Sequence, residues 1–140
     1  MTISIDTNVL AALWNDNDVF NASAALMLRD AHAKDRLIVA GPVYSELMAG
    51  PIKTEVALDR FFLETQTEVD WIFEEAMWRE AGRAYRAYVQ RRKKSGGDDA
   101  RRILTDFVIG AQALVRGYTL MTLDGHHYRA AFPRLRILAS

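Results

Sequence analysis

The sequence of 140 residues contains no cysteine, no excess of either charge and no long apolar run. The absence of cysteine excludes disulfide scaffolds, zinc ribbons and thiol nucleophiles, so we expect a protein of the reducing cytoplasm. The 18 basic and 18 acidic residues cancel, which excludes a histone-like nucleic-acid binder. No segment approaches the roughly 20 uninterrupted apolar residues of a membrane-spanning helix. Residues 1–13 lack a basic leader and carry Asp6 and Asn8 at their centre, so we expect no signal peptide.

The remaining composition predicts one domain over residues 1–140. Hydrophobic residues make up 50% of the chain, which is enough to bury a core, and no linker or repeat divides it. Short apolar runs alternate with helical patterns, which predicts an α/β fold. We expect a three-layer α/β/α sandwich with a central, mostly parallel sheet of four or five strands. The expected strands are 2–5, 37–40, 118–122 and 135–138, with a brief one near Val69, and the expected helices are 21–34, 43–49, 54–64, 73–94 and 100–116, with another after the first strand.

Turn and capping residues set the expected helix ends. Asn21 should cap the helix that follows it, and a Gly-Pro pair at 41–42 should break the chain before the next helix. Asp98 or Asp99 should cap the last long helix, which Gly117 closes as a C-terminal glycine.

Three acidic residues stand directly after predicted strands. Asp6 follows the first strand and Asp124 the fourth, so both should lie at the rim formed by the carboxyl ends of the parallel strands. Glu46 lies in the short helix after the second strand, among apolar neighbours. An acidic side chain near a helix N-terminus also interacts favourably with the helix dipole, so the position of Glu46 alone has a purely structural explanation.

A fourth acid, Asp106, lies in the last long helix on a face that should pack inward. Its neighbours on that face, Ile103, Gly110 and Ala113, are apolar or small. A buried carboxylate must be compensated by a hydrogen-bond donor, a cationic side chain or a metal ion. The small neighbours leave room for such a site.

We refer to Asp6, Glu46, Asp106 and Asp124 as the acidic quartet. Like charges gathered at one rim repel one another unless a cation lies between them. Several carboxylates together offer the hard oxygen ligands that Mg²⁺ or Mn²⁺ requires, and no cysteine or histidine set competes for a softer metal. The quartet therefore predicts a divalent metal site.

The segments that carry the quartet resemble the four motifs of PIN domains. In chain order they read Ile5-Asp6-Thr7-Asn8-Val9-Leu10, Ser45-Glu46-Leu47, Asp106-Phe107-Val108-Ile109-Gly110-Ala111 and Leu120-Met121-Thr122-Leu123-Asp124. Their order, spacing and strand or helix context most resemble the stand-alone VapC-type toxins of bacterial type II toxin-antitoxin pairs. The resemblance spans nearly the whole chain.

The resemblance implies a metal-dependent endoribonuclease that hydrolyses RNA phosphodiester bonds with Mg²⁺ or Mn²⁺ as cofactor. It assigns catalysis and metal binding to the acidic quartet, places a hydroxyl of Thr7 or Thr122 beside it and has Asn8 shape the first turn. Thr7, Asn8 and Thr122 are therefore candidates for substrate contact. It also implies a homodimer and a small antitoxin protein that inserts a peptide across the acidic groove. The chain departs from the family at His127, where an aromatic residue is usual, with Tyr128 next. We expect all three histidines at the surface or the rim.

A basic segment over residues 91–102 is a further candidate for substrate contact. It holds six basic residues against two acidic ones, and Arg91, Arg92 and Arg102 are the expected contacts. A local positive excess can bind phosphates in a salt-dependent way. The same cations can instead complement the dipole at a solvated helix end, and the sequence leaves both explanations open.

Two other functions remain open from the residues. A non-catalytic PIN-like module would use its groove only to hold nucleic acid or a protein, although the presence of all four acids argues against it. An aspartate-based phosphotransfer enzyme would use Asp6 as nucleophile, but such enzymes carry Asp-x-Asp and this chain has Asn8. For a nuclease, the residues do not decide between RNA and DNA, between one and two metal ions, or between Glu46 as ligand and as general base.

Overall fold

The computed structural model describes residues 1–50, 52, 54–96 and 102–139. These residues form a five-stranded sheet in which every neighbouring pair of strands is parallel. The strands are β1 (Thr2–Ile5), β2 (Arg36–Ala40), β3 (Glu68–Asp70), β4 (Thr119–Thr122) and β5 (Ile137–Ala139). The helices are α1 (Thr7–Leu13), α2 (Asn21–Lys34), α3 (Gly41–Met48), α4 (Glu55–Glu64), α5 (Glu75–Lys94), α6 (Leu104–Arg116) and α7 (Gly125–Ala131).

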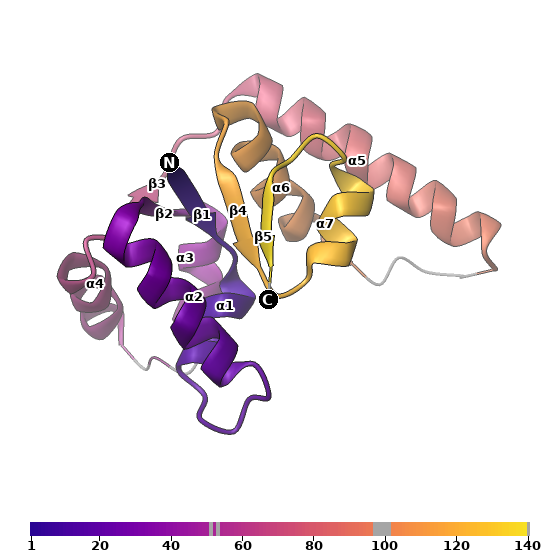
Figure 1. The fold of residues 1–140 in the computed structure, drawn as a ribbon. Coiled ribbons are helices and arrows are strands. Elements are labelled where there is room, and N and C mark those ends of the chain that lie inside the picture. Colours follow the sequence, from indigo (N-terminus) through magenta and orange to yellow (C-terminus); the bar gives the residue numbers. More distant parts are fainter. Residues whose placement is uncertain (51, 53, 97–101, 140) are drawn as a thin grey trace.

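The strand order is β3-β2-β1-β4-β5, which places β1 at the centre of the sheet. Figure 1 shows α1 and α2 on one side of the sheet and α5 and α6 on the other. The central strands are almost fully buried, since Ile3 and Ile5 of β1 and Leu120 and Met121 of β4 expose 1% or less of their surface. The architecture confirms the predicted three-layer sandwich. No helix in the described part of the chain has the length and apolar character that crossing a membrane requires.

Two helices begin differently from the prediction. The cap of α2 is Phe20, and the Asn21 side-chain amide donates to the carbonyl oxygens of Ala12 and Leu13 at 2.9 and 3.1 Å. Asn21 therefore ties α2 to the end of α1 and does not cap it. The Gly-Pro pair at 41–42 lies within the first turn of α3. Proline is tolerated there because its missing N–H would have no intrahelical partner.

The predicted start of α6 is also wrong. The helix begins at Leu104, after an extended Ile103 that is 58% exposed and so does not share the buried face expected for it. The predicted caps Asp98 and Asp99 lie outside the described residues. At the other end Gly117 adopts the left-handed conformation, with φ 74°, and closes the helix as predicted.

The short helix α7 is absent from the prediction. Its seven residues follow β4 after a gap of two and are too few to show a clear helical period. Tyr128 is 1% exposed and His127 is 7% exposed, so α7 contributes to the interior. Of the surface or rim position expected for the histidines, His127 takes no surface position but lies buried near Asp124 at the rim, whereas His32 and His126 are exposed.

Gly110 allows α6 to approach the buried ring of Phe132. A Cβ atom at position 110 would lie 2.4 Å from Cε2 and 2.7 Å from Cδ2 of that ring, which is only 3% exposed. These separations are far below ordinary van der Waals contact, and a close-packed interior gives the ring little room to move. Gly110 is therefore required by packing.

We expect Gly110→Ala to destabilise the protein. Overpacking costs about 1–3 kcal/mol, which outweighs the gain of about 1 kcal/mol that alanine brings to a helix interior. Gly82→Ala in α5 is the matched control, because a Cβ there meets nothing within 4 Å. Urea denaturation should show a lower free energy of unfolding for Gly110→Ala and an unchanged or higher one for Gly82→Ala. Equal changes in both variants would contradict the packing explanation.

Candidate active site

The sheet reverses its direction of growth between β1 and β4. From β1 the chain adds β2 and β3 on one side, and β4 and β5 lie on the other. In open α/β sheets such a switch point, at the carboxyl ends of the strands, opens a crevice for ligands. Asp6 follows β1 directly and its N–H donates to the carbonyl oxygen of Met121 in β4 at 2.8 Å. Asp124 lies two residues after β4, so both acids stand at the carboxyl ends of these neighbouring strands, as predicted.

Asp6 is the most buried acid of the quartet, with 4% of its surface exposed. Its Oδ1 accepts a hydrogen bond from the backbone N–H of Thr7 at 2.8 Å, and its Oδ2 accepts one from the Thr122 hydroxyl at 2.8 Å. Burial nevertheless raises the pKa of Asp6 to about 6, with the negative charge of Asp106 adding to the rise and the Thr122 hydrogen bond opposing it. Ionised Asp6 therefore lowers the stability of the folded protein.

Asp106 lies in the first turn of α6, with its side chain 25% exposed. Burial raises the pKa of Asp106, the charges of Glu46 and Asp124 raise it further, and the guanidinium of Arg102 lowers it. Since Asp106 also raises the pKa of Asp6, its charge interacts with all three other acids. Asp106 therefore lies within electrostatic range of the other three acids.

Two threonines hold the other acids in place. The Thr7 hydroxyl donates to Oε1 of Glu46 at 2.7 Å, so the first residue of α1 orients an acid of α3. The backbone N–H of Asp124 donates to the Thr122 hydroxyl at 3.0 Å, and that hydroxyl in turn donates to Asp6. Both predicted hydroxyls therefore lie against the quartet.

Asn8 joins the two loops that carry Asp6 and Asp124. Its side-chain oxygen accepts a hydrogen bond from the backbone N–H of Leu123 at 3.1 Å, and its side-chain nitrogen donates to the Thr122 hydroxyl at 3.4 Å. Asn8, in the first turn of α1, thus holds the turn after β4 in place.

Arg102 is the predicted basic residue that reaches the quartet. Its guanidinium forms an ion pair with Asp124, and its Nη1 lies 3.9 Å from Oδ2 of Asp106. The backbone N–H of Arg102 donates to the Tyr88 hydroxyl at 3.1 Å. Arg91 lies in the last turn of α5 with Arg92, and among the described residues it forms no ion pair with the quartet. Arg91 and Arg102 both lower the pKa of His127, after the larger effect of burial.

The donor chemistry of the quartet fits a hard divalent cation. The side chains are carboxylates flanked by hydroxyls, and the mutual repulsion that raises the pKa of Asp106 would be relieved by a positive ion. Within the described part of the chain, no three acidic or histidine side chains are grouped closely enough to count as a ready-made metal site. The guanidinium of Arg102 provides the positive charge beside Asp124 and Asp106.

Sequence reasoning missed Tyr128 as a neighbour of the quartet. Burial raises the pKa of the Tyr128 hydroxyl well above its usual range, and the charges of Asp6, Asp106 and Asp124 raise it further. The hydroxyl therefore stays protonated beside three acids. The available signal was its spacing four residues after Asp124, which becomes one helical turn once α7 is known.

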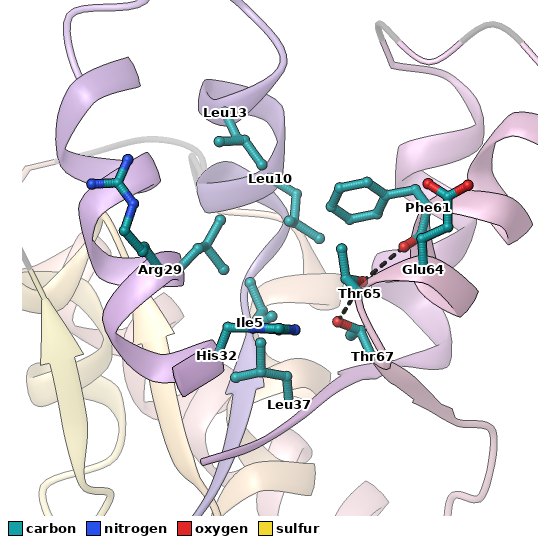
Figure 2. Close-up of a pocket in the computed structure, with 11 residues that line it drawn as sticks. Ile5, Leu10, Leu13, Arg29, His32, Leu37, Phe61, Glu64, Thr65 and Thr67 are labelled. Atoms are coloured by element: carbon teal, nitrogen blue, oxygen red, sulfur yellow. Dashed lines mark hydrogen bonds between the residues drawn. The ribbon is translucent and has the colours of Figure 1, made fainter. Parts of the chain in front are cut away.

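A separate apolar hollow of about 310 Å³ lies among α1, α2, α4 and the sheet. Figure 2 shows Leu10, Leu13 and Phe61 around it, with His32 and Arg29 on α2. No member of the quartet lines this hollow. The acidic quartet and the apolar hollow are therefore two separate sites.

Comparison with known proteins gives a family and a set of similar structures. The model of the PIN domain family matches residues 3–133. No curated protein sequence matches the chain. VapBC-1 from nontypeable Haemophilus influenzae is similar in structure at 19% identity and a TM-score of 0.67, covering 99% of this chain and 98% of that one.

Two further solved structures share the fold. VapBC2 from Rickettsia felis, bound to a DNA fragment from its promoter, has 19% identity and a TM-score of 0.64, with 99% of this chain and 98% of that one covered. VapC20 from Mycobacterium tuberculosis, described as a sarcin-ricin loop cleaving toxin, has 20% identity and a TM-score of 0.60, with 96% and 98% covered. Because the family model spans almost the whole sequence, the chain belongs to the PIN domain family.

Proposed function

We propose that the protein is a metal-dependent endoribonuclease and the toxin of a toxin-antitoxin pair of the VapBC type. The observation that carries the proposal is the meeting of four acids from distant parts of the chain at the switch point of the sheet, where Asp106 interacts with the charges of the other three. A packed core gains nothing from such a cluster, because each buried charge costs free energy. Perturbed carboxyl groups in a crevice are typical of functional sites.

Asp6 and Asp106 would hold a divalent ion, Mg²⁺ or Mn²⁺, with Asp124 and Glu46 as further ligands, directly or through water. When bound, such an ion polarises the scissile phosphate and makes water a better nucleophile. Thr122 and the Thr7 backbone fix both oxygens of Asp6, so that the carboxylate meets the ion with its orientation set. Glu46, held by the Thr7 hydroxyl, is placed either to bind the ion or to take a proton from the attacking water.

The proposed partners follow from the similar structures. Several of these are described as VapBC or toxin-antitoxin complexes, and one as a sarcin-ricin loop cleaving toxin. We therefore propose a small antitoxin as protein partner and RNA as substrate. The resemblance to VapC-type toxins adds the proposal of a homodimer as the toxin's own assembly. The second candidate function is a PIN-like binding module without catalysis, favoured by the ion pair that Arg102 makes with Asp124.

Replacing Asp6 or Asp106 with asparagine should abolish RNA cleavage. Loss of a direct metal ligand should cost more than the roughly 10–100-fold typical of an outer-shell partner, so we expect a loss above about 100-fold. The assay is cleavage of total RNA or tRNA by the purified toxin, free of antitoxin, with Mg²⁺, Mn²⁺ or EDTA. Asp30→Asn on the exposed face of α2 is the control and should retain full activity.

Full activity of Asp106→Asn, or cleavage that survives EDTA, would reject the proposed metal-dependent site. Tight Mn²⁺ binding without cleavage of any RNA would favour the binding module.

Asp6→Asn should stabilise the metal-free protein at neutral pH. The pKa of Asp6 is about 6 in the folded protein, above its ordinary value of 3.8. The free energy of unfolding therefore falls as the pH rises from about 4 to 6. At pH 7 the substitution should raise the free energy of unfolding by up to about 3 kcal/mol, since each pKa unit corresponds to about 1.4 kcal/mol. At pH 4 the difference should nearly vanish.

Urea denaturation of both proteins in EDTA at pH 4 and pH 7 measures the effect. A difference that is the same at both pH values would show that burial of the Asp6 charge is not its cause.

Arg102→Gln should weaken RNA binding. The guanidinium already lies at the quartet, where the scissile phosphate would be held, so its loss removes one phosphate contact and should reduce the slope of log K against log salt by about 1. The measurement uses the Asp6→Asn background to prevent cleavage, over a range of salt concentrations. Arg91→Gln removes the same charge nearby without an ion pair to the quartet. An equal effect of the two substitutions would instead indicate a diffuse basic surface.

A further inference from the structure

Tyr128 carries a buried hydroxyl group that has no hydrogen-bond partner among the described residues. The side chain is 1% exposed, so bulk water does not reach it. A buried hydroxyl is almost always hydrogen-bonded in folded proteins, and one that is not is unfavourable. Such a group in a native fold calls for an explanation, and a bound water or ion is one of the usual ones.

The hydroxyl faces the acidic quartet. Tyr128 lies one turn along α7 from Asp124, and its backbone N–H donates to the carbonyl oxygen of Asp124 at 3.4 Å. Its ring is held edge-on by His127, with 4.9 Å between the ring centres. Its hydroxyl lies close enough to Asp6 to favour the ionised carboxylate, although the two atoms do not meet ordinary hydrogen-bond geometry. The buried hydroxyl therefore lies near the quartet, and its ring and backbone are held there by His127 and Asp124.

Asp6 has free capacity to accept this hydrogen bond. Each carboxylate oxygen can accept two hydrogen bonds, and each oxygen of Asp6 receives one, from Thr7 and from Thr122. A third donor on this carboxylate would occupy one of the two remaining lone pairs. One lone pair of the Asp6 carboxylate would then remain for a cation.

We propose that Tyr128 is a positioning residue for the metal site, whose hydroxyl donates to Asp6, directly or through one bound water, and so fixes the carboxylate for a divalent cation. This inference rests on the proposed function, because it takes Asp6 as a metal ligand. Hydrogen bonds to ligating carboxylates orient them and strengthen metal binding. The orphaned hydroxyl, its burial and its approach to Asp6 are all accounted for by this role.

The alternative is that Tyr128 only fills the core between α7 and the sheet. Phenylalanine has nearly the same shape, so Tyr128→Phe removes the hydroxyl and keeps the packing. If packing is the whole role, the variant should bind metal as the natural protein does.

The experiment compares Mn²⁺ affinity by titration calorimetry, without RNA, for the full chain and for Tyr128→Phe. Tyr118→Phe is the matched control, because the Tyr118 hydroxyl also donates to a carboxylate, Asp70 at 3.2 Å, but precedes β4 at the opposite edge of the sheet. We expect Tyr128→Phe to weaken Mn²⁺ binding about tenfold and Tyr118→Phe to leave it within about twofold. Urea denaturation in EDTA at pH 4, where Asp6 with its pKa of about 6 is mostly protonated, should give Tyr128→Phe a nearly unchanged midpoint, because the ring and its packing are kept.

Equal Mn²⁺ affinities of the natural protein and Tyr128→Phe would overturn the inference and leave the proposed nuclease intact. Weaker binding accompanied by a clearly lower unfolding midpoint at pH 4 would also overturn it, since a packing defect then explains the loss. A natural protein that binds no Mn²⁺ would reject the metal site itself, and the role of Tyr128 with it.

Discussion

The carboxyl group of Asp6 is ionisable, yet the fold leaves only 4% of the residue exposed at the end of the central strand. Burial raises its pKa to about 6, and two hydrogen bonds only partly offset that rise. The Thr122 hydroxyl donates to the Asp6 carboxylate. Asn8 in turn contacts Thr122 and the backbone of Leu123, so it holds the residue that binds Asp6. A folded protein retains such a destabilising charge at a crevice most simply because the charge has a function there.

The parallel sheet explains how four acids come to one place. β1 and β4 are neighbours although their sequences are far apart, and the strand order reverses between them. The loops that follow these strands carry Asp6 and Asp124, while α3 and α6 deliver Glu46 and Asp106 toward the same edge. The acids thus share an electrostatic environment in which adding a cation is favourable and adding another anion is not.

Two kinds of cation can neutralise the four carboxylates: an arginine guanidinium and a divalent metal ion. The guanidinium of Arg102 pairs with Asp124 and approaches Asp106, whereas the quartet as a whole has the oxygen ligands of a divalent ion. Arg102 is therefore suited to contact a phosphate at the same edge once the acids are otherwise neutralised. In the proposed function, the donors on Asp6, with Tyr128 beside them, orient a ligand of the metal ion, and Arg102 contacts the substrate phosphate.

Local pattern in the sequence determined most strands and helices, the positions of the quartet and the family, because apolar periodicity and short motifs are properties of neighbouring residues. It misplaced the start of α6 and missed α7, whose seven residues are held by tertiary packing more than by their own periodicity. Only the tertiary structure decided that Thr122 donates to Asp6, 116 residues away, that Arg102 pairs with Asp124, and that the Tyr128 hydroxyl faces the acids. Such contacts depend on how strands and helices pack, and no local pattern encodes the direction in which a side chain from another element points.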